Sequence, residues 1–499
     1  MIRQVSIVPG EGIGNSIQLG DTLYSIINKF QQKDHKMKII YSDKEYLETP
    51  LVVILPSLGV RLTFENCNQQ ELLVIEIISF EFIKIVYNNF HLNEIRHSAD
   101  DGFLTIEANG DEGGSEEEVE NFQKTSSQEV LVKPPTLHQI YNKIFGPTYP
   151  GKLVDDCYIL SYPGISFRFK ILSQDLQDEV SKVSLNENSL LSQLLNWDKV
   201  DDIVCESLAI FNGDSWDEFF KSFKQYLLTK KKTKVSERFN GSKLIPKISK
   251  LIVNLSERDI KIILNSNKDM TKTSEFTIKI GETTQQEILN ILGPPDDYFN
   301  KFDCRLLIHK HLKQSLSISN GGSSDTISGN SIDKFHNYFS LGLDFLYDLN
   351  PESKKSHNST GILKKVVIHN GGVTKSLDFM RWNKCNWEIH TGKDGVGSDI
   401  CVNSSMYFKD IPSAFFSTLN SQVIRPVLLN RNEAEFIDND LDIINVNEVP
   451  AHHSKPGRNS NEKRTNQVKT WGQSKLYGGK YCIWEVVDSI GCITCVTIY

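Results

Sequence analysis

Residue pairs that could bind a metal ion occur at three places in the chain. Cys492 and Cys495 have the Cys-x-x-Cys spacing of zinc and redox sites. They lie in an expected strand, where residues three apart point to opposite faces. The pairs His309–His311 and His452–His453 offer imidazoles, but a zinc site needs about three or four ligands, and no matching pair accompanies them. We therefore predict neither a metal site nor a cofactor, and we interpret the two cysteines as packed core thiols.

A glycine cluster near the N-terminus is similar in its spacing to a nucleotide-binding loop. Gly10, Gly12 and Gly14 follow an expected strand. A dinucleotide site would need a βαβ unit and an acidic residue about 20 positions further on. Here a helix and then a series of antiparallel-looking strands follow, so we interpret the cluster as a turn. The chain has no Ser nucleophile elbow, HExxH motif or P-loop, and we predict no catalytic residue and no enzymatic activity.

Overall charge and hydropathy narrow the class of protein further. The net charge of −8 argues against a nucleic-acid partner, which usually requires a strongly basic field. The longest apolar runs, such as 72–78, have the length of a strand and are broken by charge, so no transmembrane segment is expected. The nine cysteines lack the spacing of a disulfide framework. These features predict a cytoplasmic protein with reduced thiols.

One segment of the chain, 230–234, is densely basic. Two interpretations remain open for it. A solvated linker is the simpler one, and the alternative is a surface facing an anionic membrane, where each basic residue contributes about 1 kcal/mol. The lysines are Lys230, Lys231, Lys232 and Lys234.

The clearest helix signal in the chain runs from Thr284 to Pro294. Thr284 is an N-cap residue, and Glu287 three positions later can complete a capping box. Apolar residues then recur with helical spacing, so one stripe of the helix faces inward. Gly293 is expected to end the helix in the αL conformation, and Pro294 prevents its continuation. These residues are predicted to act as structural caps and stops.

The same arrangement recurs elsewhere in the chain. In 134–147, Thr136 is the expected cap, and Gly146 and Pro147 end the helix. The segment 19–31 carries a similar apolar stripe.

A fourth copy is expected at 409–420. Asp410 would cap this helix, and Pro412 would stand near its first turn, where proline is favoured. Strands follow the first three helices, and in each case a glycine opens an alternating apolar run. These glycines are Gly59, Gly164 and Gly342.

The resulting fold class is α+β, with about four tandem units, each a helix followed by an antiparallel β-meander. The helices should pack on small sheets, because the apolar stripe and one sheet face must both be buried. The strands between residues 37 and 87 are expected to form one meander, and 173–202 a polar insertion. The expected division is a first unit 1–106, an acidic linker 107–133, a second unit 134–228, a basic linker with strands 229–275, a third unit 276–400 with a low-complexity insertion 315–330, and a fourth unit 401–499 with a polar insertion 431–470.

Short segments spread over nearly the whole chain resemble the phagosome assembly factor family. No single segment is diagnostic, and the resemblance rests on their order. The segments are 19–23, 59–64 with 73–76, 135–140 through 146–151, 162–167, 337–344, 365–369 and 425–428. The insertions at 107–129, 315–330 and 431–470 depart from the family pattern and leave the common core in place.

The resemblance implies a non-enzymatic adaptor in autophagy. Family members act with a WD-repeat β-propeller partner at the phagophore, the site of autophagosome formation, and phosphoinositides recruit the pair largely through the propeller. The resemblance therefore implies a cytoplasmic protein that is recruited to that membrane. The alternatives are a Golgi or endosomal membrane-trafficking factor that binds membrane directly and, more remotely, a cryptic enzyme or lipid-binding module. The family supplies no catalytic residues.

Deletion of 107–129 is predicted to leave folding and function intact. Within 110–120, Val119 is the only large apolar residue, so the segment has little with which to join a core. The thermal unfolding midpoint of the deletion variant should stay within about 2 °C of that of the full chain. A large drop in this midpoint would show that the segment belongs to a core.

Overall fold

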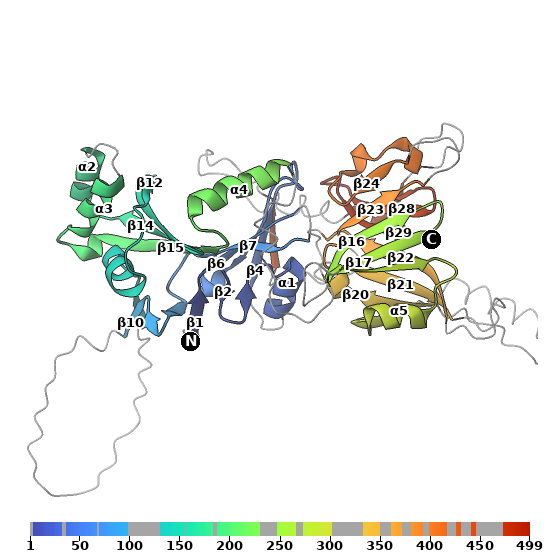
Figure 1. The fold of residues 1–499 in the computed structure, drawn as a ribbon, viewed down its shortest axis with the longest axis horizontal. Helices are drawn as coiled ribbons and strands as arrows, with labels where there is room; N and C mark the ends of the chain where they lie inside the picture. Colours follow the sequence, from blue (N-terminus) through green and yellow to red (C-terminus); the bar gives the residue numbers. More distant parts are fainter. Residues whose placement is uncertain are drawn as a thin grey trace, which may run out of the picture. The chain divides into compact units, whose positions relative to one another are not determined.

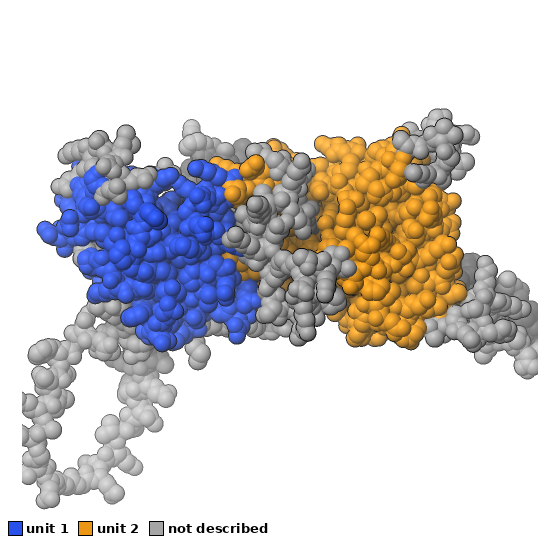
Figure 2. All heavy atoms as spheres, viewed as in Figure 1, with its two compact units in different colours: residues 1–18, 55–61, 74–221 blue, residues 19–54, 62–73, 222–499 orange. Residues whose placement is uncertain are grey.

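The fold is described from a computed structural model (Figure 1). Its described residues are 3–31, 36–66, 69–97, 130–154, 156–182, 187–229, 247–265, 273–301, 333–349, 361–371, 381–392, 399–416, 426–430, 441–445 and 473–499. The chain divides into two compact units, each assembled from separate stretches of sequence (Figure 2). Unit 1 comprises 1–18, 55–61 and 74–221, and unit 2 comprises 19–54, 62–73 and 222–499.

Strands form the largest part of the structure, and the first of them lie where the sequence predicts. In β4 (Met37–Tyr41), β5 (Leu51–Leu55) and β6 (Val60–Phe64), every second side chain is buried. This alternation places one face of the sheet against a core. The three strands belong to a nine-stranded sheet with the order β12-β13-β14-β15-β7-β6-β5-β4-β26. Its other strands are β7 (Leu72–Ile77), β12 (Lys152–Val154), β13 (Cys157–Tyr162), β14 (Ile165–Ile171), β15 (Ile203–Phe211) and β26 (Leu441–Asn445).

An eight-stranded sheet repeats this plan with later parts of the chain. Its order is β19-β20-β21-β22-β29-β28-β27-β25. In both sheets two runs of strands meet at an antiparallel pair, which is β7 with β15 in one and β22 with β29 in the other. The runs have four and five strands in the nine-stranded sheet, and four strands each in the eight-stranded sheet. The strands are β19 (Asp297–Lys301), β20 (Asp333–Tyr338), β21 (Leu343–Asp348), β22 (Ile362–His369), β25 (Val427–Asn430), β27 (Gln473–Gly478), β28 (Cys482–Val487) and β29 (Ile493–Ile498).

Two five-stranded sheets also share one plan. Their orders are β3-β2-β1-β8-β9 and β18-β17-β16-β23-β24, and each contains a parallel pair, β1 with β8 and β16 with β23. Strands β10 (Glu94–His97) and β11 (Val130–Lys133) form a separate pair. The strands are β1 (Arg3–Val8), β2 (Gly12–Ile13), β3 (Ile17–Gln18), β8 (Ile83–Tyr87), β9 (Phe90–His91), β16 (Lys247–Asn254), β17 (Asp259–Asn265), β18 (Thr273–Lys279), β23 (Trp387–His390) and β24 (Cys401–Asn403).

The described helices are short and amphipathic. In α1 (Leu23–Gln31) the residues of the predicted stripe, Leu23, Ile26, Ile27 and Phe30, are all buried. Helix α5 (Gln285–Leu292) likewise buries its apolar side, and α4 (Trp216–Thr229) is the longest described helix with 14 residues. None of the described helices is long and apolar enough to cross a membrane.

The core of unit 2 lies between the eight-stranded sheet and one of the five-stranded sheets. Trp387 of β23 and Trp484 of β28 are both fully buried, with ring centroids 6.1 Å apart. Phe415 packs edge-on against Trp484 from a third segment. Ile288 and Leu292 bring helix α5 into the same core. The two sheets of unit 2 are therefore packed face to face through large aromatic side chains.

The prediction of a helix at 409–420 is wrong for the described residues of this segment, 409–416. Two 3₁₀ turns, Phe408–Asp410 and Ser413–Phe415, replace it, and Asp410 ends the first turn instead of capping a helix. The cause is Pro412, because a proline forces the residue before it out of the helical region. Ile411 accordingly has φ −74° and ψ 124°.

Three further predictions need correction. Residues 173–202 contain helices α2 (Gln174–Lys182) and α3 (Glu187–Leu195), whose buried leucines make them part of the fold. Within 431–470, β26 adds to the nine-stranded sheet by pairing in parallel with β4. The meander expected between 37 and 87 ends at β7, since β8 pairs with β1 in a different sheet.

Gly59 and Gly342 occupy equivalent places, each after a 3₁₀ turn and directly before a strand. Both are left-handed, with φ 63° and ψ 33° at Gly59 and φ 69° and ψ 35° at Gly342. A Cβ atom at Gly342 would lie 2.3 Å from the backbone oxygen of Asn383, and one at Gly59 would lie 2.6 Å from that of Ser79. The glycines predicted to open these strands are therefore required by conformation and by a close backbone approach.

Substitution of Gly342 by alanine should destabilise unit 2 more than the same substitution at Gly491. Gly491 is also left-handed, with φ 65°, but no described atom lies within 4 Å of a Cβ there. Gly491→Ala should therefore lower the thermal unfolding midpoint only by the cost of the left-handed conformation, about 1–2 kcal/mol or a few degrees. Gly342→Ala should lower it at least twice as far, and equal shifts would contradict the backbone contact.

Candidate functional site

The predicted caps of α5 form a reciprocal pair of hydrogen bonds. The backbone N–H of Glu287 donates to Oγ1 of Thr284 at 3.3 Å, and that of Thr284 donates to Oε2 of Glu287 at 2.7 Å. This second bond lowers the pKa of Glu287. Gly293, followed by Pro294, has φ 80° and ψ −166°, so the expected αL conformation is wrong although φ is positive. The residues hold the helix ends and face no reactive group that the structure describes.

The second predicted copy has the same bonds around a wider turn. Thr136 and Gln139 exchange hydrogen bonds of 3.0 and 3.3 Å. The turn that follows, Gln139–Ile144, is a π-helix instead of the expected α-helix. Gly146, which precedes Pro147, accepts a hydrogen bond from the hydroxyl of Tyr162 at 2.7 Å.

A tyrosine hydroxyl reaches the helix end in both copies. Tyr338 donates to the carbonyl oxygen of Gly293 at 2.9 Å, just as Tyr162 donates to that of Gly146. Burial raises the pKa of both tyrosines, so each hydroxyl stays protonated and acts as a donor. In both copies the glycine predicted to end the helix thus accepts a hydrogen bond from a tyrosine of the following strands.

The basic segment falls outside the described residues, as do His309–His311 and His452–His453. The lysines concerned are Lys230, Lys231, Lys232 and Lys234. Their predicted contact with a membrane therefore stays a prediction.

The two cysteines of the Cys-x-x-Cys sequence are buried on or beside β29. Sγ of Cys495 lies 3.1 Å from Oε2 of Glu485 on the neighbouring strand, while Cys492 pairs with Tyr407 through a backbone bridge. The groups of described residues with metal-ligand geometry do not include them.

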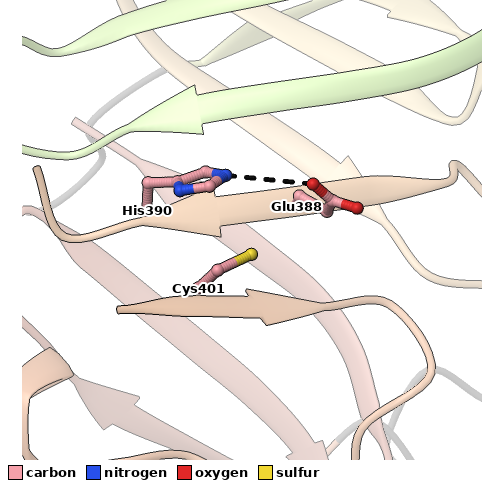
Figure 3. A group of neighbouring side chains, drawn as sticks. All are labelled: Glu388, His390 and Cys401. Carbon is pink, nitrogen blue, oxygen red and sulfur yellow. Dashed lines mark ion pairs between the residues drawn. The ribbon is translucent and has the colours of Figure 1, made fainter. Parts of the chain in front are cut away.

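A different group of ligand-type side chains lies on β23 and β24, and the sequence analysis missed it. Glu388 and His390 are two residues apart on β23, and Cys401 on β24 is the register partner of His390. The three ligand atoms lie within 4.8 Å of one another, with Nε2 of His390 3.8 Å from Oε2 of Glu388. Figure 3 shows the imidazole and the carboxylate turned toward each other and the sulfur pointing toward them from the neighbouring strand. We call these three residues the β23–β24 cluster.

Two charged residues border the β23–β24 cluster. Oδ2 of Asp399 lies 2.9 Å from Nδ1 of His390, and Nζ of Lys250 lies 2.8 Å from Oε1 of Glu388. Burial, together with the Glu388 and Asp399 carboxylates, raises the pKa of the Cys401 thiol. In the sequence, the only sign of the cluster is two pairs of ligand-type residues, Glu388 with His390 and Asp399 with Cys401, each two positions apart. Residues 393–398 lie between the two pairs.

Unit 2 also contains a small cavity, which is the alternative place for a reaction site. It has a volume of about 10 Å³, room for roughly one water molecule. Lys384, Asn370 and Cys492 line it together with mostly apolar neighbours. This cavity is too small for a substrate.

The outer strands of the two large sheets carry exposed apolar side chains. Strands β12, β19 and β25 each present two consecutive large apolar residues that are between 39% and 64% exposed. Because consecutive side chains point to opposite faces, both faces of each strand are uncovered within the described part of the chain. The residues are Leu153 and Val154 on β12, Tyr298 and Phe299 on β19, and Val427 and Leu428 on β25.

Large open sheets accompanied by a few short helices define the described part of the chain as a β-rich α+β protein. The chain belongs to the phagosome assembly factor 1 family, whose family model matches residues 14–103 and 122–499. The unmatched residues between these ranges coincide with most of the acidic segment 107–129. This membership supports an autophagy-related role.

Curated relatives from distant organisms match most of the chain. The PHAF1 protein T01G9.2 of Caenorhabditis elegans is 23% identical over 443 residues, which cover 86% of each chain. The PHAF1 protein CG7083 of Drosophila melanogaster is 22% identical over 79% of this chain and 76% of its own. The PHAF1 protein At3g51130 of Arabidopsis thaliana is 23% identical over 78% of this chain and 75% of its own. No solved structure matches the chain.

His336 on β20 joins the sheet to the first turn of α5. It is fully buried, and its Nε2 lies 2.9 Å from the amide nitrogen of Gln285. The rings of Tyr298 and Tyr347 stand edge-on to it at 4.8 and 4.7 Å. Burial lowers the pKa of His336 to about 4, and the Lys334 cation adds to the shift. The imidazole is therefore neutral near pH 7 and accepts the amide hydrogen bond.

The stability of unit 2 should fall as the pH falls from about 6.5 to about 4. In this window the unfolded chain binds a proton at His336 that the folded chain does not bind, so the folded state is penalised. His336→Gln should remove on the order of 1–3 kcal/mol of that pH dependence, measured by urea unfolding at several pH values. His91→Gln changes an exposed histidine and serves as the control. Parallel pH profiles of His336→Gln and the unmodified protein would contradict the assignment.

Proposed function

We propose that this protein is a non-enzymatic adaptor in autophagy that acts with a WD-repeat β-propeller partner at the phagophore. It is cytoplasmic and reaches the membrane through that partner, which supplies the phosphoinositide contact. The family membership supports the autophagy-related part of this proposal. The exposed edges of the two large sheets support the adaptor part.

An exposed edge strand is a template for pairing with another protein. Its unpaired N–H and C=O groups add a partner strand, and its side chains select the sequence of that strand. Proteins usually protect such edges with charge or with proline. Here charge or proline is present at each strand, as Lys152 on β12, Asp297 on β19 and Pro426 before β25, but each strand also exposes an apolar pair, which favours docking.

The remaining border of the nine-stranded sheet, next to β4, supports the same interpretation. The outer side of β4 is covered by β26, a five-residue strand from the polar segment 431–470. Leu441 pairs with Met37 and Asn445 with Tyr41 in a parallel register. The chain thus adds a short strand to one of its own sheet edges, which is the mode of binding that we propose for the partner.

We also propose that the chain contains four copies of one structural unit, with the boundaries expected from the sequence. Each unit begins with a helix or a helical turn and continues with a series of strands. Two observations support this. Tyr162 and Tyr338 bind the glycine after their helices in the same way, and Gly59 and Gly342 share one conformation.

Charge introduced at one edge strand should weaken binding of the propeller partner. The variants Val154→Lys, Phe299→Lys and Leu428→Lys each place a cation on a different edge strand, where it opposes strand addition. Because all three side chains are exposed, each variant should keep its stability within about 0.5 kcal/mol. We expect one variant to lower the affinity for a purified WD-repeat propeller at least tenfold, measured by calorimetry, while the other two serve as its controls.

Liposome flotation separates the adaptor from a trafficking factor that binds membrane directly. The adaptor should float with phosphoinositide vesicles only when the propeller is added. If the protein floats alone and binds no propeller, the Golgi or endosomal trafficking function is supported instead.

If the three lysine variants bind the propeller with equal affinity, the edge strands are not the docking surface.

A further inference from the structure

We propose that the β23–β24 cluster is a binding site for Zn²⁺, with Glu388, His390 and Cys401 as ligands and Asp399 as the residue that orients the histidine. The site does not depend on the proposed adaptor function. It follows from strand register, from the types of the side chains and from their distances.

The register of β23 and β24 brings the ligands together. His390 and Cys401 are paired across the two strands, and Glu388 lies on the same face of β23 as His390. Ligand atoms around a tetrahedral zinc ion lie about 3.3–3.8 Å apart, because the bonds to zinc measure about 2.0–2.3 Å. The three atoms here lie within 4.8 Å of one another. Side-chain rotations that move them by about 1 Å would close the site.

The ligand types select a transition metal ion. A thiolate, an imidazole and a carboxylate together suit Zn²⁺, whereas Mg²⁺ and Ca²⁺ prefer oxygen ligands alone. When the ion binds, the thiol of Cys401 loses its proton to solvent and the thiolate sulfur donates an electron pair to the metal. The fourth position of a tetrahedral site remains open to water or to a group from a partner.

Asp399 gives the site the outer hydrogen bond that zinc-binding histidines usually have. Its Oδ2 lies 2.9 Å from Nδ1 of His390, so a hydrogen bond from Nδ1–H to this carboxylate leaves Nε2 as the nitrogen that would bind the metal ion. Oδ1 of the same carboxylate accepts a hydrogen bond from the backbone N–H of Gly392 at 3.2 Å. The orienting carboxylate is therefore itself held in place.

Lys250 is the competitor of the metal ion. It forms an ion pair of 2.8 Å with Oε1 of Glu388, and its positive charge repels a metal ion bound at Oε2 of the same carboxylate. The side chains of Glu388 and His390 are 30% and 27% exposed, so an ion can reach them from solvent. Removal of Lys250 should therefore strengthen binding, which a purely structural ion pair would not predict.

The proposal is tested by titrating the metal-free, full-length protein with Co²⁺ and following the near-ultraviolet absorption that a cobalt–thiolate bond produces. We expect one equivalent of this absorption, and its loss on addition of Zn²⁺. Cys401→Ser should abolish it, and Asp399→Asn should weaken binding about 10- to 100-fold. Lys250→Gln should tighten it. His91→Ala, an exposed histidine outside the cluster, should leave it unchanged.

Other outcomes would overturn the site. Absorption that persists in Cys401→Ser would place the metal at another cysteine. A dissociation constant weaker than about 1 mM would make the cluster an ordinary group of surface charges. A Lys250→Gln variant that binds no more tightly would remove Glu388 from the ligand set. Circular dichroism and thermal unfolding of each variant, recorded without metal, show whether its fold is intact.

Discussion

The packing of Trp387 against Trp484 is the contact on which much of unit 2 depends. It joins two sheets face to face, and both indoles are fully buried. Because side chains alternate along a strand, the inward positions of Trp387 and Ile389 force Glu388 and His390 to the opposite face of β23. The burial of two apolar residues thus creates the outward-facing pair of polar residues beside Cys401. The core and the β23–β24 cluster are two sides of one strand.

The large sheets combine a well-packed centre with incompletely protected borders. Their middle strands pair on both sides, whereas β12, β19 and β25 end the sheets with exposed apolar side chains. Such borders would favour aggregation in a protein that worked alone. In a protein that docks on others they are useful, since strand addition needs a border of this kind. The family membership and the sheet borders therefore lead to the same class of function.

Local patterns in the sequence predicted local structure well and long-range pairing poorly. The alternation in Met37–Tyr41 and Val60–Phe64 located strands to the residue, and Thr284 with Glu287 located the start of a helix. Pro412 broke the fourth expected helix because the residue before a proline avoids the helical region. The β23–β24 cluster escaped notice because its ligands meet only through strand register, which spacing along the chain does not reveal. The strand in 431–470 was missed for the same reason, as its partner β4 lies hundreds of residues earlier.

The position of β29 has a consequence for the synthesis of the protein. This strand is synthesised after the seven other strands of the eight-stranded sheet, yet it lies in the middle of that sheet, between β22 and β28. The earlier strands β19 to β22 therefore emerge with an open border that is filled only after β29 has been synthesised. At roughly 5–20 residues per second, the interval between β22 and β29 lasts on the order of ten seconds. During that time the nascent chain presents an unpaired strand to solvent, and it should depend on chaperones that shield such strands.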